Sequence, residues 1–199
     1  MGMTRDDLAA ALVRVADHME TVADALNRAD GQLGDGDLGV TMVRGGRAAK
    51  AAAAGLPQDV GMALMKVAQA FTQVSGSSFG TLLATGLMSA AKATRDRTDV
   101  PWSEISPLLG GAREAMQTRG KAALGDKTVL DALAAAADGV AGLDEPQAIL
   151  AAARAAVAQT LDAFRGREAK IGRARIFAEK SVGLDDPGML AFQFMLEAL

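Results

Sequence analysis

The start of the chain repeats an apolar residue every three or four positions. The apolar positions are Leu8, Leu12, Val15, Met19, Val22 and Leu26. Steps that alternate between four and three residues place these side chains on one face of an α-helix of about six turns. Thr4 followed by Asp7 resembles a capping box and marks the expected start of this helix. A helix with one apolar face must bury that face, so the chain is expected to build its core from packed helices.

Seven further helices are expected after this first one. Their approximate ranges are 40–54, 58–74, 80–94, 105–118, a segment that begins after Thr128, 145–164 and 187–199. Only 4% of the residues are aromatic, and alanine, which has the highest helix propensity, dominates the hydrophobic half. No run alternates Val, Ile, Thr and aromatic residues as strands do. The sequence therefore predicts an all-α fold: one barrel or bundle of eight antiparallel up-and-down helices, with residues 1–199 in a single domain.

Charge, cysteine content and hydropathy exclude several classes of protein. The formal net charge of −3 and the pI near 5.2 offer no basic surface for nucleic acid. The chain has no cysteine, which excludes disulfides and thiolate chemistry. The acidic N-terminal residues do not form a signal peptide, and no apolar run is long enough to cross a bilayer. We therefore expect a cytoplasmic protein that binds neither nucleic acid nor membranes.

Residues 30–39 are rich in aspartate and glycine. Asp30, Asp35 and Asp37 alternate with four glycines between two expected helices. Carboxylates this close repel one another unless a cation neutralises them, and hard divalent cations such as Mg²⁺ prefer carboxylate oxygens. The spacing does not fit the EF-hand pattern. This stretch therefore indicates either a metal site, with Mg²⁺ facing an anionic ligand, or a solvated turn between helices.

Four polar, glycine-containing stretches are expected at one end of the bundle. They are residues 30–39, 75–80, 125–128 and 172–188. They follow the first, third, fifth and seventh helices, and every second connection of an up-and-down bundle lies at the same end. Together they offer carboxylates for a metal, hydroxyls and helix N-terminal amides for phosphate, and cationic side chains. This combination predicts a nucleotide bound with Mg²⁺.

The same stretches resemble the nucleotide-binding L subunit, or L domain, of dihydroxyacetone kinases. Asp30 followed by Gly34-Asp35-Gly36-Asp37-Leu38-Gly39-Val40-Thr41-Met42 resembles a family block that reads Gly-Asp-Gly-Asp-His-Gly-x-Asn-Met. The sequence Gly125-Asp126-Lys127-Thr128-Val129-Leu130-Asp131-Ala132 matches a second block. A third runs from Gly172-Arg173-Ala174 through Ser181-x-Gly183 to Asp186-Pro187-Gly188, and the Ser77-Ser78 loop matches a Gly/Ser phosphate-binding block more loosely. The resemblance covers residues 8–199.

The resemblance implies a barrel of eight antiparallel helices whose one end is closed by ADP or ATP. It also implies that Asp30, Asp35 and Asp37 hold two Mg²⁺ ions between the phosphates, as metal ligands and catalytic groups. The residues implied to bind the nucleotide are Leu38, Gly39, Thr41, Met42, Ser77, Ser78, Gly125, Thr128, Arg173, Asp186, Pro187 and Gly188. The serines would contact phosphate and residues 125–128 the adenine, while Arg173 and the 186–188 turn would close over the nucleotide.

The resemblance further implies a partner. In the family the keto substrate is held covalently by a histidine of a separate K domain, and His18, the only histidine here, matches no such motif. We therefore expect a kinase subunit that works with a separate K-type subunit. The phosphate would come either from exchanging ATP or from a phosphotransferase-system protein that rephosphorylates bound ADP.

Three residues depart from the family pattern and leave alternatives open. Leu38, Thr41 and Phe79 stand where the family has histidine, asparagine and glycine. The acceptor is accordingly open between dihydroxyacetone and a related sugar such as erythrulose. Two other functions also remain: a non-catalytic nucleotide sensor that binds a transcription or signalling partner, and a structural barrel with a calcium-stabilised loop.

Overall fold

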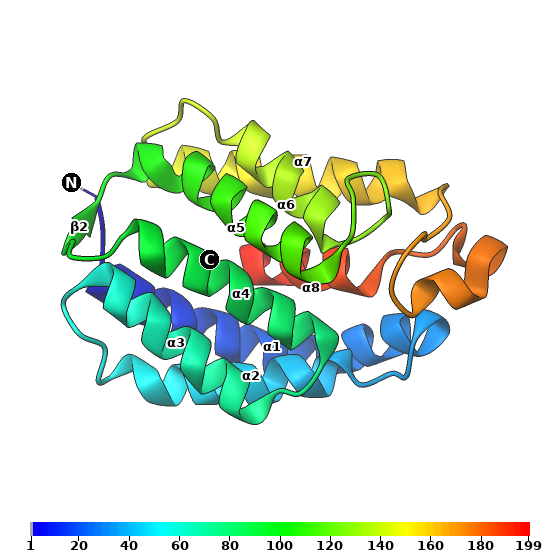
Figure 1. Ribbon diagram of the computed structural model, residues 1–199, viewed down its shortest axis with the longest axis horizontal. Coiled ribbons are helices and arrows are strands. Elements are labelled where there is room, and N and C mark those ends of the chain that lie inside the picture. Colours follow the sequence, from blue (N-terminus) through cyan, green and yellow to red (C-terminus); the bar gives the residue numbers. More distant parts are fainter. Residues whose placement is uncertain (1) are drawn as a thin grey trace.

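A computed structural model describes residues 2–199, which form an elongated bundle of eight α-helices (Figure 1). The helices are α1 (Arg5–Leu33), α2 (Leu38–Ala53), α3 (Val60–Val74), α4 (Ser78–Ala93), α5 (Ile105–Gly120), α6 (Val129–Gly139), α7 (Pro146–Arg165) and α8 (Pro187–Glu197). Two 3₁₀-helices, η1 (Trp102–Glu104) and η2 (Ala174–Ser181), lie in connections. The strands β1 (Met3–Thr4) and β2 (Asp99–Val100) form a short antiparallel pair.

The helices close into a barrel. Each helix packs against the one before it and the one after it, and α8 packs back against α1. Figure 1 shows successive helices running back and forth along the long axis of the molecule. The all-α, up-and-down fold predicted from the sequence is therefore confirmed.

The first helix begins as predicted and ends later. The Thr4 hydroxyl accepts a hydrogen bond from the backbone N–H of Asp7, and the Asp7 carboxylate accepts one from Thr4, which completes the capping box. At its other end α1 continues to Leu33, whose side chain is only 2% exposed. Burial of this leucine favours one more helical turn through Gly31 despite glycine's low helix propensity. Asp30 therefore lies in the last turn of α1 rather than in the following loop.

The helices pack closely because alanine and glycine line their contacts. A Cβ atom on Gly45 of α2 would lie 2.0 Å from the ring of Phe71 on α3, so only glycine fits here. The core between α1, α2, α3 and α8 contains Met19, Leu26 and Met42, each at most 2% exposed. Small side chains at these contacts allow helices to approach one another closely.

The two ends of the barrel differ in character. The β1–β2 pair lies at one end, at the left in Figure 1, and the connections α1–α2, α3–α4, α5–α6 and α7–α8 lie at the other. Within residues 2–199 no helix is long and apolar enough to cross a membrane. The end with the four polar connections, called the polar end below, is where we expect a site.

Candidate functional site

A cavity of about 850 Å³ opens at this polar end. Residues of all four connections line it, so the sequence prediction that the four stretches meet is confirmed. Of the fifteen residues predicted for the site, twelve line the cavity: Asp30, Asp35, Asp37, Leu38, Thr41, Ser77, Ser78, Thr128, Arg173, Asp186, Pro187 and Gly188. The volume is within the range of small-molecule and cofactor sites.

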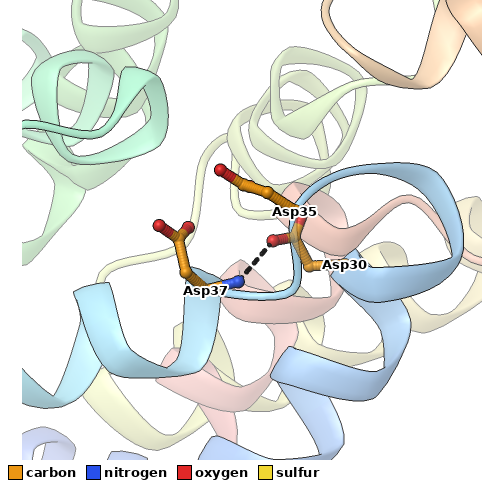
Figure 2. Close-up of side chains that lie close together, drawn as sticks. All are labelled: Asp30, Asp35 and Asp37. Carbon is orange, nitrogen blue, oxygen red and sulfur yellow. Dashed lines mark hydrogen bonds between the residues drawn. The ribbon is translucent and has the colours of Figure 1, made fainter.

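Three carboxylates converge at the α1–α2 turn (Figure 2). One oxygen from each of Asp30, Asp35 and Asp37 lies within 4.8 Å of one from each of the other two. Asp30 accepts hydrogen bonds from the backbone N–H groups of Asp37 at 2.9 Å and Leu38 at 3.3 Å. Asp37 occupies the N-cap position of α2, yet its side chain makes no capping hydrogen bond. The Asp37 carboxylate is therefore available for a ligand.

One cationic side chain contacts this cluster. The guanidinium of Arg173, from the α7–α8 connection, pairs with Asp35 and holds the pKa of the Asp35 carboxyl below its ordinary value. A cation between the carboxylates would relieve the repulsion among all three at once. Oxygen ligands on a largely exposed rim suit Mg²⁺, which keeps water and substrate phosphates in its coordination shell. The residues present thus fit a Mg²⁺ site.

The turn that brings the carboxylates together depends on glycine at two positions. Gly36 has φ = +77°, a left-handed conformation that glycine adopts without strain. A Cβ on Gly34 would lie 2.5 Å from a carboxylate oxygen of Asp30. Asn27, one turn before Asp30, accepts a hydrogen bond from the backbone N–H of Val40 at 3.3 Å. Asn27 was not predicted from the sequence, although its position three residues before Asp30 places it on the same face of α1.

The α3–α4 connection presents a helix N-terminus to the cavity. Ser77 caps α4 by accepting a hydrogen bond from the backbone N–H of Gly80 at 3.0 Å, and Ser78 is exposed. Free N–H groups and the positive end of the helix dipole make such a terminus a site for phosphate. The ring of Phe79 packs toward α8, where a Cβ on Gly188 would lie 3.3 Å from it. The bulky residue at position 79 thus leaves the capping interaction intact.

Asp131 organises the α5–α6 connection. Its carboxylate accepts hydrogen bonds from the backbone N–H groups of Gly125 at 2.6 Å and Thr128 at 2.9 Å, so the loop folds back on the start of α6. Thr128 lines the cavity together with the apolar residues Val129 and Leu130. This side of the cavity suits the flat, mostly apolar face of a nucleotide base.

The α7–α8 connection supplies the remaining wall. Asp186 caps α8 by accepting a hydrogen bond from the backbone N–H of Met189 at 2.8 Å, and Pro187 occupies the first turn. Burial raises the pKa of the Asp186 carboxyl to about 7, while the N–H groups of Met189 and Gly188 act in the opposite direction. Asp186 is thus a cavity carboxyl whose charge changes near neutral pH.

Three of the predicted residues pack beside the cavity instead of lining it. Met42 is 2% exposed in the core, and a Cβ on Gly39 would lie 2.1 Å from the carbonyl oxygen of Ala23 on α1. Gly125 has φ = +91° and shapes the loop before Thr128. Leu38 stands where the family pattern has a histidine. Its side chain is 6% exposed, and it belongs to the apolar core while also lining the cavity.

Two cationic residues of the cavity were missed by the sequence analysis. Arg44 on α2 and Arg119 at the end of α5 both line it. Arg44 follows Asp37 by seven residues, so both side chains lie on one face of α2. That helical spacing is the signal that could have identified Arg44. The position of Arg119 depends on how α5 packs and has no comparable signal.

Comparison with known proteins identifies the family of this chain. Residues 32–199 match the family model described as the DAK2 domain. The chain is 28% identical, over its full length and 97% of the relative, to the "PEP-dependent dihydroxyacetone kinase, ADP-binding subunit DhaL" of Escherichia coli K12. It is 33% identical to the mouse triokinase/FMN cyclase, of which it spans 36%.

Structural similarity points the same way. The dihydroxyacetone kinase of C. freundii in complex with AMP-PNP and Mg²⁺ has a TM-score of 0.76 to this chain, with 22% sequence identity over 96% of the chain. The chain covers 33% of that kinase, so it corresponds to about a third of the larger protein and to almost all of the bacterial subunit. This likeness shows a shared fold. With the match over residues 32–199, it follows that the chain belongs to the DAK2 domain family.

Proposed function

We propose that the chain is the ADP- or ATP-binding subunit of a dihydroxyacetone kinase or a related keto-sugar kinase. In this role it transfers a phosphoryl group to a substrate held on a separate K-type subunit. The observation that carries the proposal is the convergence of Asp30, Asp35 and Asp37 on one cavity with the N-terminus of α4. Carboxylates for Mg²⁺ and amides for phosphate at one place are what a metal–nucleotide site requires.

Each wall of the cavity would receive one part of the nucleotide. The base would lie against Thr128 and the apolar residues of α6, and the phosphates against Ser77, Ser78 and the carboxylates. Two Mg²⁺ ions, held by the carboxylates of Asp30, Asp35 and Asp37, would neutralise the phosphate charge. Catalysis of phosphoryl transfer at such a site consists mostly of positioning and charge neutralisation. The protein's own part is to fix the three carboxylates and to bring Arg173 to the phosphate end.

A partner must supply the substrate in this proposal. The name of the Escherichia coli relative describes a subunit of a PEP-dependent kinase, which supports a multi-subunit assembly and a phosphotransferase-system donor acting on bound ADP. On η2, beside the cavity, Ile176 is 78% exposed. An apolar group there suits contact with a second subunit. Abundant nucleotide and Mg²⁺ make the cytoplasm the fitting location.

One observation favours a second candidate, a non-catalytic nucleotide-binding subunit that regulates a partner. Leu38 is buried in the core and cannot donate a hydrogen bond to phosphate or substrate. A chain of this kind would retain Mg–ADP without transferring its phosphate. The two candidates therefore differ in turnover and agree in nucleotide binding.

Reconstitution separates these candidates. The purified chain would be mixed with a family K-type subunit, Mg²⁺, dihydroxyacetone or erythrulose, and either ATP or a phosphotransferase-system donor. We expect phosphorylated sugar from the mixture and little or none from the chain alone. Robust turnover by the chain alone would contradict the need for a partner. Binding of Mg–ADP without turnover in any mixture would favour the regulatory subunit.

A further inference from the structure

Lys127 is buried almost completely, which is rare for lysine. Its side chain is 1% exposed, and its backbone has φ = +63°. The ammonium group donates hydrogen bonds to three main-chain carbonyl oxygens: Arg167 at 2.8 Å, Ser181 at 2.8 Å and Arg165 at 3.3 Å. An ammonium has three donors, so all of them are used. Burial of a charge is costly without such partners, and this complete set accounts for the position of Lys127 inside the protein.

The three carbonyl groups lie at the two ends of one segment, residues 166–183. Arg165 directly precedes the segment, Arg167 is at its start and Ser181 is near its end. The backbone N–H of Gly183 also donates to the carbonyl of Arg165 at 2.7 Å, and that of Ala169 donates to the Ser181 hydroxyl at 2.9 Å. Lys127 therefore bridges both ends of a closed loop from a position outside it.

The middle of the 166–183 segment carries the cavity residues. It is held by the Arg173–Asp35 ion pair and by a hydrogen bond from the backbone N–H of Lys170 to the carbonyl of Asp126 at 3.1 Å. Gly172 and Arg173 line the cavity, and both are exposed. Ala178 adopts φ = 41° and ψ = −120° within η2, an unusual conformation for a residue with a side chain. Figure 1 shows η2 projecting at the end of the molecule beside the α1–α2 turn. The position of Arg173 over the carboxylates thus depends both on its ion pair with Asp35 and on how the two ends of the segment are fixed.

We propose that Lys127 is a positioning residue that fixes the 166–183 segment, and with it Arg173, against the cavity. Its neighbour Thr128 lines the base side of the cavity, so the lysine joins the base-side loop to the segment at the phosphate side. Lys127 would raise nucleotide affinity without touching the nucleotide. The affinity part of this inference rests on the proposed function, whereas the ordering of the segment does not.

The test compares Lys127→Met with Lys121→Met. Methionine has a similar length and no donor. Lys121 lies in the same connection, also has a left-handed backbone at φ = 54°, and is exposed, so its variant controls for loss of charge and for backbone strain. Hydrogen–deuterium exchange would be followed by mass spectrometry without nucleotide, and Mg–ADP affinity by calorimetry. For Lys127→Met we expect residues 166–183 to exchange at least about tenfold faster, helices α1–α4 to be unchanged, and affinity to fall at least about tenfold. Lys121→Met should match the unmodified chain in both measurements.

Two results would overturn the inference. One is a folded Lys127→Met protein whose 166–183 segment exchanges at the original rate. The other is faster exchange spread evenly over all helices, which would mean a general structural role. If Lys127→Met does not fold, acetylation of the unmodified chain decides: Lys127 should react at least about tenfold more slowly than Lys121, and equal rates would refute the buried contact. Failure of the unmodified chain to bind Mg–ADP would refute the proposed function alone.

Discussion

Asp30 and Asp37 carry the same kind of side chain but have different neighbours, and this difference gives them different roles. The Oδ2 atom of Asp30 accepts hydrogen bonds from two backbone N–H groups at the start of α2, which fixes the turn. Asp37 occupies the N-cap position of α2, and its side chain makes no capping hydrogen bond, so its carboxylate is available for a ligand. Asp35 forms an ion pair with Arg173. Neighbouring carboxylates repel one another, and their convergence here is what motivates the proposed metal site.

A prediction at the residue scale concerns Asp186 and pH. Burial raises the pKa of its carboxyl from 3.8 to about 7 in the folded protein. A raised folded pKa means that stability is present at low pH and is lost as pH rises toward 7, because the buried group must then ionise. Asp186→Asn keeps the helix cap and removes the ionisation. We expect the free energy of unfolding of this variant, relative to the unmodified chain, to increase by about 1–3 kcal/mol between pH 5 and pH 7.5.

Urea denaturation at the two pH values measures this difference. Asp138→Asn, which changes an exposed aspartate at the far end of α6, is the matched control and should show no such increase. A constant difference between Asp186→Asn and the unmodified chain at both pH values would contradict a raised pKa.

At the scale of helices, periodicity was sufficient to predict type and order but not where each element ends. The stripe from Leu8 to Leu26 predicted α1, and Leu33 extended it only because the folded core buries that leucine. The four connections lie together as predicted, because every second connection of an up-and-down bundle is at the same end. The 3₁₀-helix η2 was not predicted, since its position depends on Lys127, a contact distant in sequence. Leu38 could not be placed from the sequence either, because a leucine beside a polar turn has no pattern that identifies its core contacts.

A prediction at this scale concerns the contact between α1 and α2. A Cβ on Gly39 would lie 2.1 Å from the carbonyl oxygen of Ala23, so Gly39→Ala must push the two helices apart. We expect this variant to lose about 1–3 kcal/mol of stability. Gly110→Ala is the matched control, because Gly110 also lies in a helix and a Cβ there meets nothing within 4 Å. The control should gain about 0.5–1 kcal/mol from better helix propensity. Equal effects in urea denaturation would mean that the helices are not in close contact.

At the scale of the whole molecule, the contact between α8 and α1 closes the barrel and makes each helix depend on two neighbours. This arrangement predicts that residues 1–199 unfold as one domain. Trp102, the only tryptophan, packs against the apolar core formed by α6, α7 and α8, whereas circular dichroism reports on all helices. We expect tryptophan fluorescence and circular dichroism to give one common melting temperature, which Mg–ADP raises for both. Two separate midpoints would contradict a single domain.

The site at the polar end is the central claim, and metal and nucleotide should bind there as a unit. Asparagine in place of Asp35 or Asp37 removes a ligand charge and keeps the size of the side chain. Each change should weaken Mg–ADP binding at least about tenfold, or about 1.4 kcal/mol. Neither should unfold the protein, because both carboxylates are exposed and their mutual repulsion is relieved. Asp138→Asn again serves as the control, with unchanged affinity.

The measurement is a calorimetric titration of Mg–ADP into the unmodified chain, Asp35→Asn, Asp37→Asn and Asp138→Asn, repeated with ADP in the absence of Mg²⁺. The account predicts tight binding to the unmodified chain and the control, weaker binding to both site variants, and weak binding of ADP to every protein without Mg²⁺. Unchanged affinity in both site variants would remove the metal site and, with it, the kinase function proposed for the chain.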